Sequence, residues 1–155
     1  MKVTCFIVLW CALAPVSVSG GDVDAGDPRS PSPDGATVAF SSIEDGDGLP
    51  ATFTVKFVIS GMGIAPAGVN IENTGHHHLL IDVTELPDFN QPLPESDAVR
   101  HFDKGQSDAE ITLAEGSHTL QLLLADYRHV PHDPPVISES ITVHVSANAP
   151  EQTNP

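Results

Sequence analysis

The residues best suited to chemistry in this sequence are histidines, and they gather in two stretches. A run of three, residues 76–78, leads directly into an apolar segment, residues 79–83. His129 and His132 follow a second apolar segment, residues 118–126. Histidine is the commonest metal ligand and the only side chain whose unperturbed pKa lies close to neutral pH. The sequence therefore points first to metal chemistry.

The spacing of these histidines predicts a metal site. His76 and His78 are two residues apart, so a strand would present both imidazoles on one face. His129 and His132 lie in a proline-containing loop from which they would complete the coordination. Three or four neutral imidazoles without a thiolate suit Cu(II) or Zn(II). The predicted ligands are His76, His78, His129 and His132, and the alternative is that these histidines cap strand ends and order a turn.

The other histidines and the nearby carboxylates are expected to have roles other than binding the metal. His77 is expected on the core face, although a register shift of one residue would exchange it with its neighbours. His101 and His118 are expected together at the far end of the domain. We expect His118 to bond back to the backbone, as a corner tyrosine does in sandwich domains. One of three carboxylates, Asp82, Asp126 or Asp133, is expected to accept a hydrogen bond from a ligand ring and fix its tautomer.

The elements that must position these residues are short strands. Runs rich in β-branched residues alternate with glycine and proline, and nothing shows sustained helical periodicity. The expected fold is all-β: an immunoglobulin-like β-sandwich of about six to seven strands. The third and fifth expected strands are antiparallel neighbours in such a fold, so both histidine stretches should meet at one end. The expected strands are residues 36–40, 52–59, 77–83, 110–113, 118–126 and 137–145.

Alternation within the expected strands assigns their faces. Residues 79, 81 and 83 should point into the core, together with residues 120, 122 and 124. Leu80 and Leu123 then lie on the opposite face, which we expect to be partly covered. The segment of residues 86–105 contains three prolines, so it is expected to be a long crossover or a poorly ordered edge.

The beginning of the chain is typical of a secretory signal. Residues 1–20 have a positive start, an apolar stretch and small residues at the end, so we expect a cleaved signal peptide and a periplasmic or secreted protein. Both cysteines lie in this segment, which would leave the mature chain without a thiol. The remaining expected parts are a flexible acidic and proline-rich leader (21–35), the sandwich domain (36–147) and a disordered tail (148–155). No stretch of the mature chain is apolar enough to span a membrane.

The net charge and the absence of catalytic motifs exclude several classes of function. Twenty-one acidic residues against six basic ones give a formal net charge of −15, which disfavours binding to nucleic acid. The sequence has no nucleophile elbow, zincin helix or phosphate-binding loop, so we expect no enzymatic activity. Two functions remain: a Cu(II)- or Zn(II)-binding module, or a metal-free module that contacts a protein or polymer of the cell envelope.

Several separate motifs together resemble one known family. They are MG (62–63), PAG (66–68), NTGHHHLLID (73–82), HFDKGQ (101–106), GSHTLQL (116–122) and HVPHDPPV (129–136). The chain resembles the bacterial domain of unknown function numbered 4399 over roughly residues 52–145. The resemblance implies a small exported bacterial domain marked by these histidine and Gly-Gln motifs. It implies no particular biochemical activity.

Overall fold

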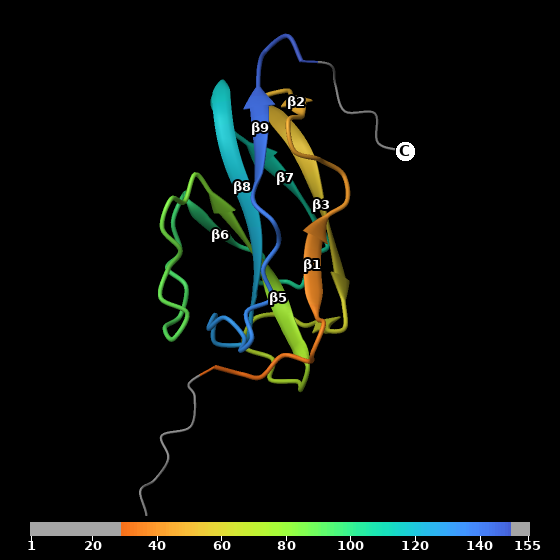
Figure 1. The fold of residues 1–155 in the computed structure, drawn as a ribbon, viewed down its shortest axis with the longest axis vertical. Coiled ribbons are helices and arrows are strands. Elements are labelled where there is room, and N and C mark those ends of the chain that lie inside the picture. The colour runs from red at the N-terminus through yellow and green to blue at the C-terminus, as the bar shows by residue number, and fades with distance from the viewer. Residues whose placement is uncertain (1–28, 150–155) are drawn as a thin grey trace, which may run out of the picture.

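Two β-sheets pack face to face in the computed structural model, which describes residues 29–149 (Figure 1). The smaller sheet has the order β1-β3-β7, and all of its strands are antiparallel. The larger sheet has the order β2-β9-β8-β5-β4, with β6 paired to β5 outside this path. The smaller sheet contains β1 (Thr37–Phe40), β3 (Thr52–Ser60) and β7 (Asp108–Thr112). The larger contains β2 (Gly48–Leu49), β4 (Gly63–Ile64), β5 (Thr74–Ile81), β6 (Val99–His101), β8 (Gly116–Ala125) and β9 (Ile141–Val145).

This strand order confirms the expected immunoglobulin-like sandwich. The six expected strands correspond to β1, β3, β5, β7, β8 and β9, and the three additional strands have only two or three residues each. Within residues 29–149 there is no helix, and hence none that is long and apolar enough to cross a membrane. The predicted signal peptide, most of the predicted leader and the last six residues lie outside the described residues.

The core fills the space between the sheets. Alternate side chains of β8, namely Leu120, Leu122 and Leu124, point into it as predicted. Leu79 and Ile81 of β5 do the same. Their partners from the other sheet include Val55 and Phe57 of β3 and Ile111 of β7.

The register between β5 and β8 places the histidines. The two strands are antiparallel neighbours, as predicted, and His76 lies opposite Ala125, the last residue of β8. The loop that follows β8 therefore begins beside the triple histidine. The predicted meeting of the two histidine stretches at one end of the domain is confirmed.

The outer face of the larger sheet is covered, although partial cover was expected. Leu80 and Leu123 are almost completely buried there and pack with Leu93 and Val99. The segment of residues 86–105 is thus not a poorly ordered edge, because it supplies these covering side chains and the strand β6.

Val83 is on the outer face rather than in the core, which corrects the prediction from strict alternation. Asp82 has a positive φ of 56°, so regular strand geometry ends at Ile81. The chain turns there, and Val83 packs against the outer apolar cluster.

The end of the predicted leader is attached to the domain. The amide of Ser32 donates to the carbonyl of Asp133 at 3.0 Å, and the amide of Asp133 donates to the carbonyl of Ser30 at 3.0 Å. These reciprocal bonds make residues 30–32 part of the packed structure, whereas a flexible segment was expected.

Candidate metal centre

Strands β5 and β6 bring three histidines together on the outer face of the larger sheet. His76 and His78 of β5 are fully buried, and their ring centroids are 4.6 Å apart. His101 lies directly opposite His78 in the register of β5 and β6, and these two rings are 4.4 Å apart. His76 and His78 are thus shielded from solvent, whereas His101 is only partly buried.

A tight turn after β8 adds His129. Its φ is 66°, and its amide donates to the carbonyl of Asp126 at 2.9 Å. The buried carboxylate of Asp126 holds the same turn together, because it accepts the amides of Arg128 at 2.8 Å and Val130 at 3.1 Å. This geometry turns the ring of His129 toward β5.

The nitrogens of three imidazoles converge. His129 Nδ1 lies 3.0 Å from His76 Nε2 and 3.3 Å from His78 Nε2. A neutral imidazole has a single in-plane lone pair, so His129 Nδ1 cannot accept two full hydrogen bonds from both neighbours. A tetrahedral ion about 2.05 Å from each nitrogen would separate its ligand atoms by about 3.3 Å. The observed separations are therefore close to those of a metal site.

A carboxylate stands at the edge of this group. Asp103 Oδ1 is 3.8 Å from His76 Nε2 and 3.9 Å from His129 Nδ1. The side chain of Asp103 is half exposed, whereas His76 and His78 are inaccessible. The centre therefore has buried imidazoles and a solvent-exposed carboxylate at its edge.

The electrostatics keep the interior imidazoles neutral. Burial, and next the neighbouring His129, lower the pKa of His76 to about 4. Burial and then His76 lower the pKa of His78 to about 2, and burial also lowers the pKa of His101. Neutral imidazole is the form that binds a metal, so protons compete weakly for this centre near neutral pH.

Several nitrogens in the centre have unused hydrogen-bonding capacity. His76 Nδ1, His78 Nδ1 and His101 Nε2 are buried without a hydrogen-bond partner among the described residues. His101 also has a hydrogen bond with the backbone of Pro94. If that bond uses Nδ1–H, as the unpartnered Nε2 requires, the lone pair of Nε2 is left for another ligand.

Three of the four predicted ligands lie together, and the fourth does not. His132 is buried, with Nδ1 3.2 Å from the carbonyl oxygen of Ser30, while a Cβ added to Gly75 would lie 2.9 Å from His132 Nε2. Gly75 shares the inner side of β5 with His77, so His132 lies across the strand from His76 and His78.

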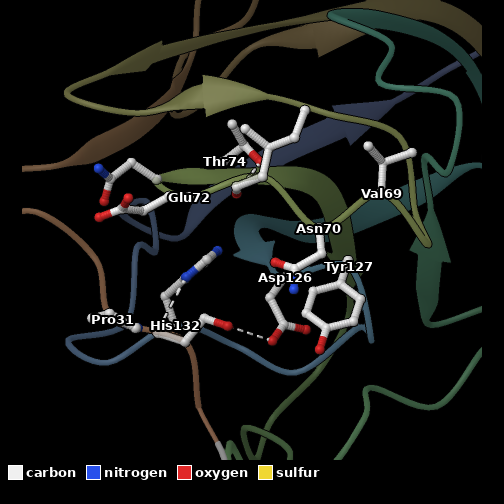
Figure 2. Close-up of a pocket in the computed structure, with 11 residues that line it drawn as sticks. Pro31, Val69, Asn70, Glu72, Thr74, Asp126, Tyr127 and His132 are labelled. Carbon is white, nitrogen blue, oxygen red and sulfur yellow. Dashed lines mark hydrogen bonds between the residues drawn. The ribbon is translucent and has the colours of Figure 1, made fainter.

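His132 instead lines a separate pocket of about 190 Å³. Figure 2 shows its ring between the β5 entry and the leader, beside Asp126 and Tyr127. Ser30 Oγ donates to Asp126 Oδ2 at 2.7 Å there. Burial lowers the pKa of His132 as well.

Sequence reasoning missed His101 and Asp103 as members of the centre. His101 was expected beside His118, but its pairing with His78 through β6 places it in the centre. β6 ends at His101, and Asp103 lies in the turn that follows. Their places in the centre depend on how this segment folds across β5, which no pattern in the sequence indicated.

The remaining predicted positions have clear roles outside the centre. His77 points inward and packs on Phe57 with ring centroids 4.8 Å apart. His118 Nε2 lies 2.9 Å from the carbonyl oxygen of Ala114, which confirms the expected backbone bond. Its Nδ1 lies 2.7 Å from Asp82 Oδ2, and this bond raises the pKa of His118.

The three predicted acceptor carboxylates are engaged elsewhere. Asp82 binds His118, and Asp126 organises the turn described above. Asp133 forms an ion pair with Arg29 at 2.7 Å. Asp103, rather than any of these, is the carboxylate beside His76 and His129.

Comparison with known families confirms the resemblance. Residues 55–146 match the family described as Domain of unknown function (DUF4399), which is more than half of the chain. The chain belongs to this family. Its match contains every histidine of the centre and the turn that carries His129.

Two further comparisons add little. Fibronectin(III)-like modules of CbhA from Clostridium thermocellum match with a TM-score of 0.38 and 11% sequence identity, covering 70% of this chain and 93% of that one. The immunoglobulin-like assignment rests on strand order and pairing rather than on this similarity. A search of curated proteins finds no match to this DUF4399 chain.

Proposed function

We propose that this DUF4399 domain is a non-enzymatic module that binds Cu(II) or Zn(II). The observation that carries the proposal is the convergence of three imidazoles, with His129 Nδ1 3.0 Å and 3.3 Å from the Nε2 atoms of His76 and His78. His132 is not a ligand in this proposal, because it lies across β5 from His76 and His78. His101 and Asp103 lie beside the three imidazoles on the other side of the strand. The nitrogen-rich set favours these two ions over Mg²⁺ or Ca²⁺, which prefer oxygen.

The domain would act outside the cytoplasm. The signal-like residues 1–20 support export to the periplasm or beyond. A centre with at least three protein ligands and a covered interior suits holding or delivering an ion. An acidic chain with a net charge of −15 would also concentrate cations around itself.

Calorimetric titration of the untagged protein with Cu(II) and Zn(II), near pH 7 and near pH 5, tests this function. We expect one ion per chain with sub-micromolar affinity near pH 7. The affinity should change little near pH 5, because pKa values of about 4 for His76 and about 2 for His78 leave both imidazoles neutral there. The variant H76A/H78A should lose the tight complex while keeping the β-rich circular dichroism of the native chain.

The matched control is His144→Ala, which removes an exposed histidine from β9 on the far side of β8. It should bind as the native chain does. Equal loss in both variants, or no tight complex in the native chain, would reject the metal function. The histidines would then have a structural role, and the metal-free module that contacts the cell envelope would become the preferred function.

A further inference from the structure

The donors around His129 form two overlapping sets rather than one. The inner set contains His76, His78 and His129, and the outer set contains His101, Asp103 and His129. Within each set the ligand atoms lie within 4.8 Å of one another. His129 is the member that both sets share.

The two sets differ in chemistry and in exposure. The inner set is all imidazole, and two of its three members are fully buried. The outer set includes the carboxylate of Asp103, whose side chain is 53% exposed, while that of His129 is 26% exposed. A hydrated ion arriving from solvent therefore meets the outer set first, and the negative charge of Asp103 attracts it.

The shared histidine provides a path between the sets. His129 Nδ1 lies 3.0 Å from His76 Nε2 of the inner set and 3.9 Å from Asp103 Oδ1 of the outer set. The ring of His101 contacts the rings of both His78 and His129, with centroids 4.4 Å and 4.7 Å away. An ion bound to His129 can thus exchange its other ligands one at a time without returning to water.

We propose that a divalent ion is captured by His101, Asp103 and His129 and then passes to His76, His78 and His129. This inference rests on the proposed metal function and adds the route by which the centre is loaded. The two positions exclude each other because both need His129, so the protein holds a single ion. Asp103 and His101 set the rate of loading, whereas His76 and His78 set the affinity of the final complex.

Stopped-flow mixing of the full chain with Cu(II), combined with rapid freeze-quench electron paramagnetic resonance, tests the route. The native chain should load in two phases, and the early species should show fewer coordinating nitrogens than the final one. Asp103→Asn and His101→Gln should slow the first phase about tenfold, the size of a local electrostatic or ligand effect on association. In both variants the final species should still show the nitrogen ligands supplied by His76, His78 and His129.

The matched control is Asp108→Asn, which removes the same charge from an exposed position on β7 in the other sheet. It should load at the native rate. The variant H76A/H78A should stop at the early species and bind its ion weakly.

Three outcomes would overturn the route. The first is a single phase with the same rate in the native chain, Asp103→Asn and His101→Gln. The second is tight binding of two ions per chain, which would require both sets to be filled together. In the third, the native chain forms no tight complex at all, and this result rejects the metal function along with the route.

Discussion

At the scale of single residues, the candidate centre depends on how closely the start of β5 can approach the end of β8. Gly75 lies on the inner side of β5, where His132 and the last residues of β8 press against the backbone. A Cβ at this position would lie 2.6 Å from the carbonyl oxygen of Ala125 and 2.9 Å from His132 Nε2. Glycine is therefore required here by contact rather than by backbone conformation.

We expect Gly75→Ala to destabilise the protein by about 1–3 kcal/mol, the usual range for overpacking. The displaced carbonyl of Ala125 belongs to the strand end from which the His129 turn departs, so metal affinity should fall as well. Urea denaturation measures the first effect and calorimetric titration the second. Gly48→Ala is the control, because nothing lies within 4 Å of its added Cβ. Equal stability of the two variants would contradict the argument.

Residue chemistry was only partly predictable. The alternation of β5 correctly separated His76 and His78 from His77, since side chains on a strand point to opposite faces. The positions of His101 and His132 were not predictable, because each depends on how a loop folds across the sheet. Such tertiary contacts leave no periodic signal in the sequence.

At the scale of elements, the turn after β8 supplies His129 to the candidate metal centre. The carboxylate of Asp126 is almost completely buried and accepts Ser30 Oγ, the amides of Arg128 and Val130, and the Arg128 guanidinium. Burial raises the pKa of Asp126, but these hydrogen bonds outweigh it and leave the pKa below its usual range. Asp126 is thus a positioning residue for His129, since it shapes the turn without touching the centre.

Asp126→Ala should destabilise the fold by about 3 kcal/mol, because it leaves several buried donors without an acceptor. It should also weaken metal binding, as His129 loses its fixed orientation. Thermal denaturation and calorimetric titration measure the two effects. Asp133→Ala removes a nearby carboxylate whose ion pair with Arg29 is partly exposed, so it should cost less than about 1 kcal/mol. A variant of Asp126 with native affinity would show that His129 is positioned by other contacts.

The main strands were predictable from the sequence, whereas the role of the covering segment, residues 86–105, was not. The strands of the sandwich have strong alternating patterns, which decided the fold class. Partial cover of Leu80 and Leu123 was predicted from their place on the outer face. That residues 86–105 supply the cover was not predicted, because this segment has three prolines and few apolar residues.

At the scale of the whole molecule, buried histidines link folding to pH. The pKa values of His76 and His77 fall to about 4 in the folded protein from an ordinary value of 6.5, chiefly through burial. The unfolded chain then binds more protons than the folded one between these values, so acid favours unfolding. The bond to Asp82 raises the pKa of His118, and its contribution is lost in a separate window above pH 6.5.

We expect the metal-free protein to lose stability as the pH falls from about 6.5 to about 4, by about 1.4 kcal/mol per pH unit for each such histidine. Urea denaturation at several pH values measures the slope. His77→Leu keeps an apolar contact with Phe57 but removes one titrating group. It should therefore reduce the slope of the unfolding free energy against pH by the contribution of one histidine. The same slope in the native chain and this variant would show that His77 does not contribute.

Adjacent side chains of β5 point to opposite faces of the sheet. The length of the connection before β5 therefore decides which histidines reach which face. Three consecutive histidines divide into two that face His129 and one that contacts Phe57. Sliding β5 by one residue would present His77 alone where two imidazoles now stand, and would force His76 and His78 among the core leucines. Changes of one residue in length before Thr74 should therefore be far more damaging than changes of two, even where the loop itself tolerates either.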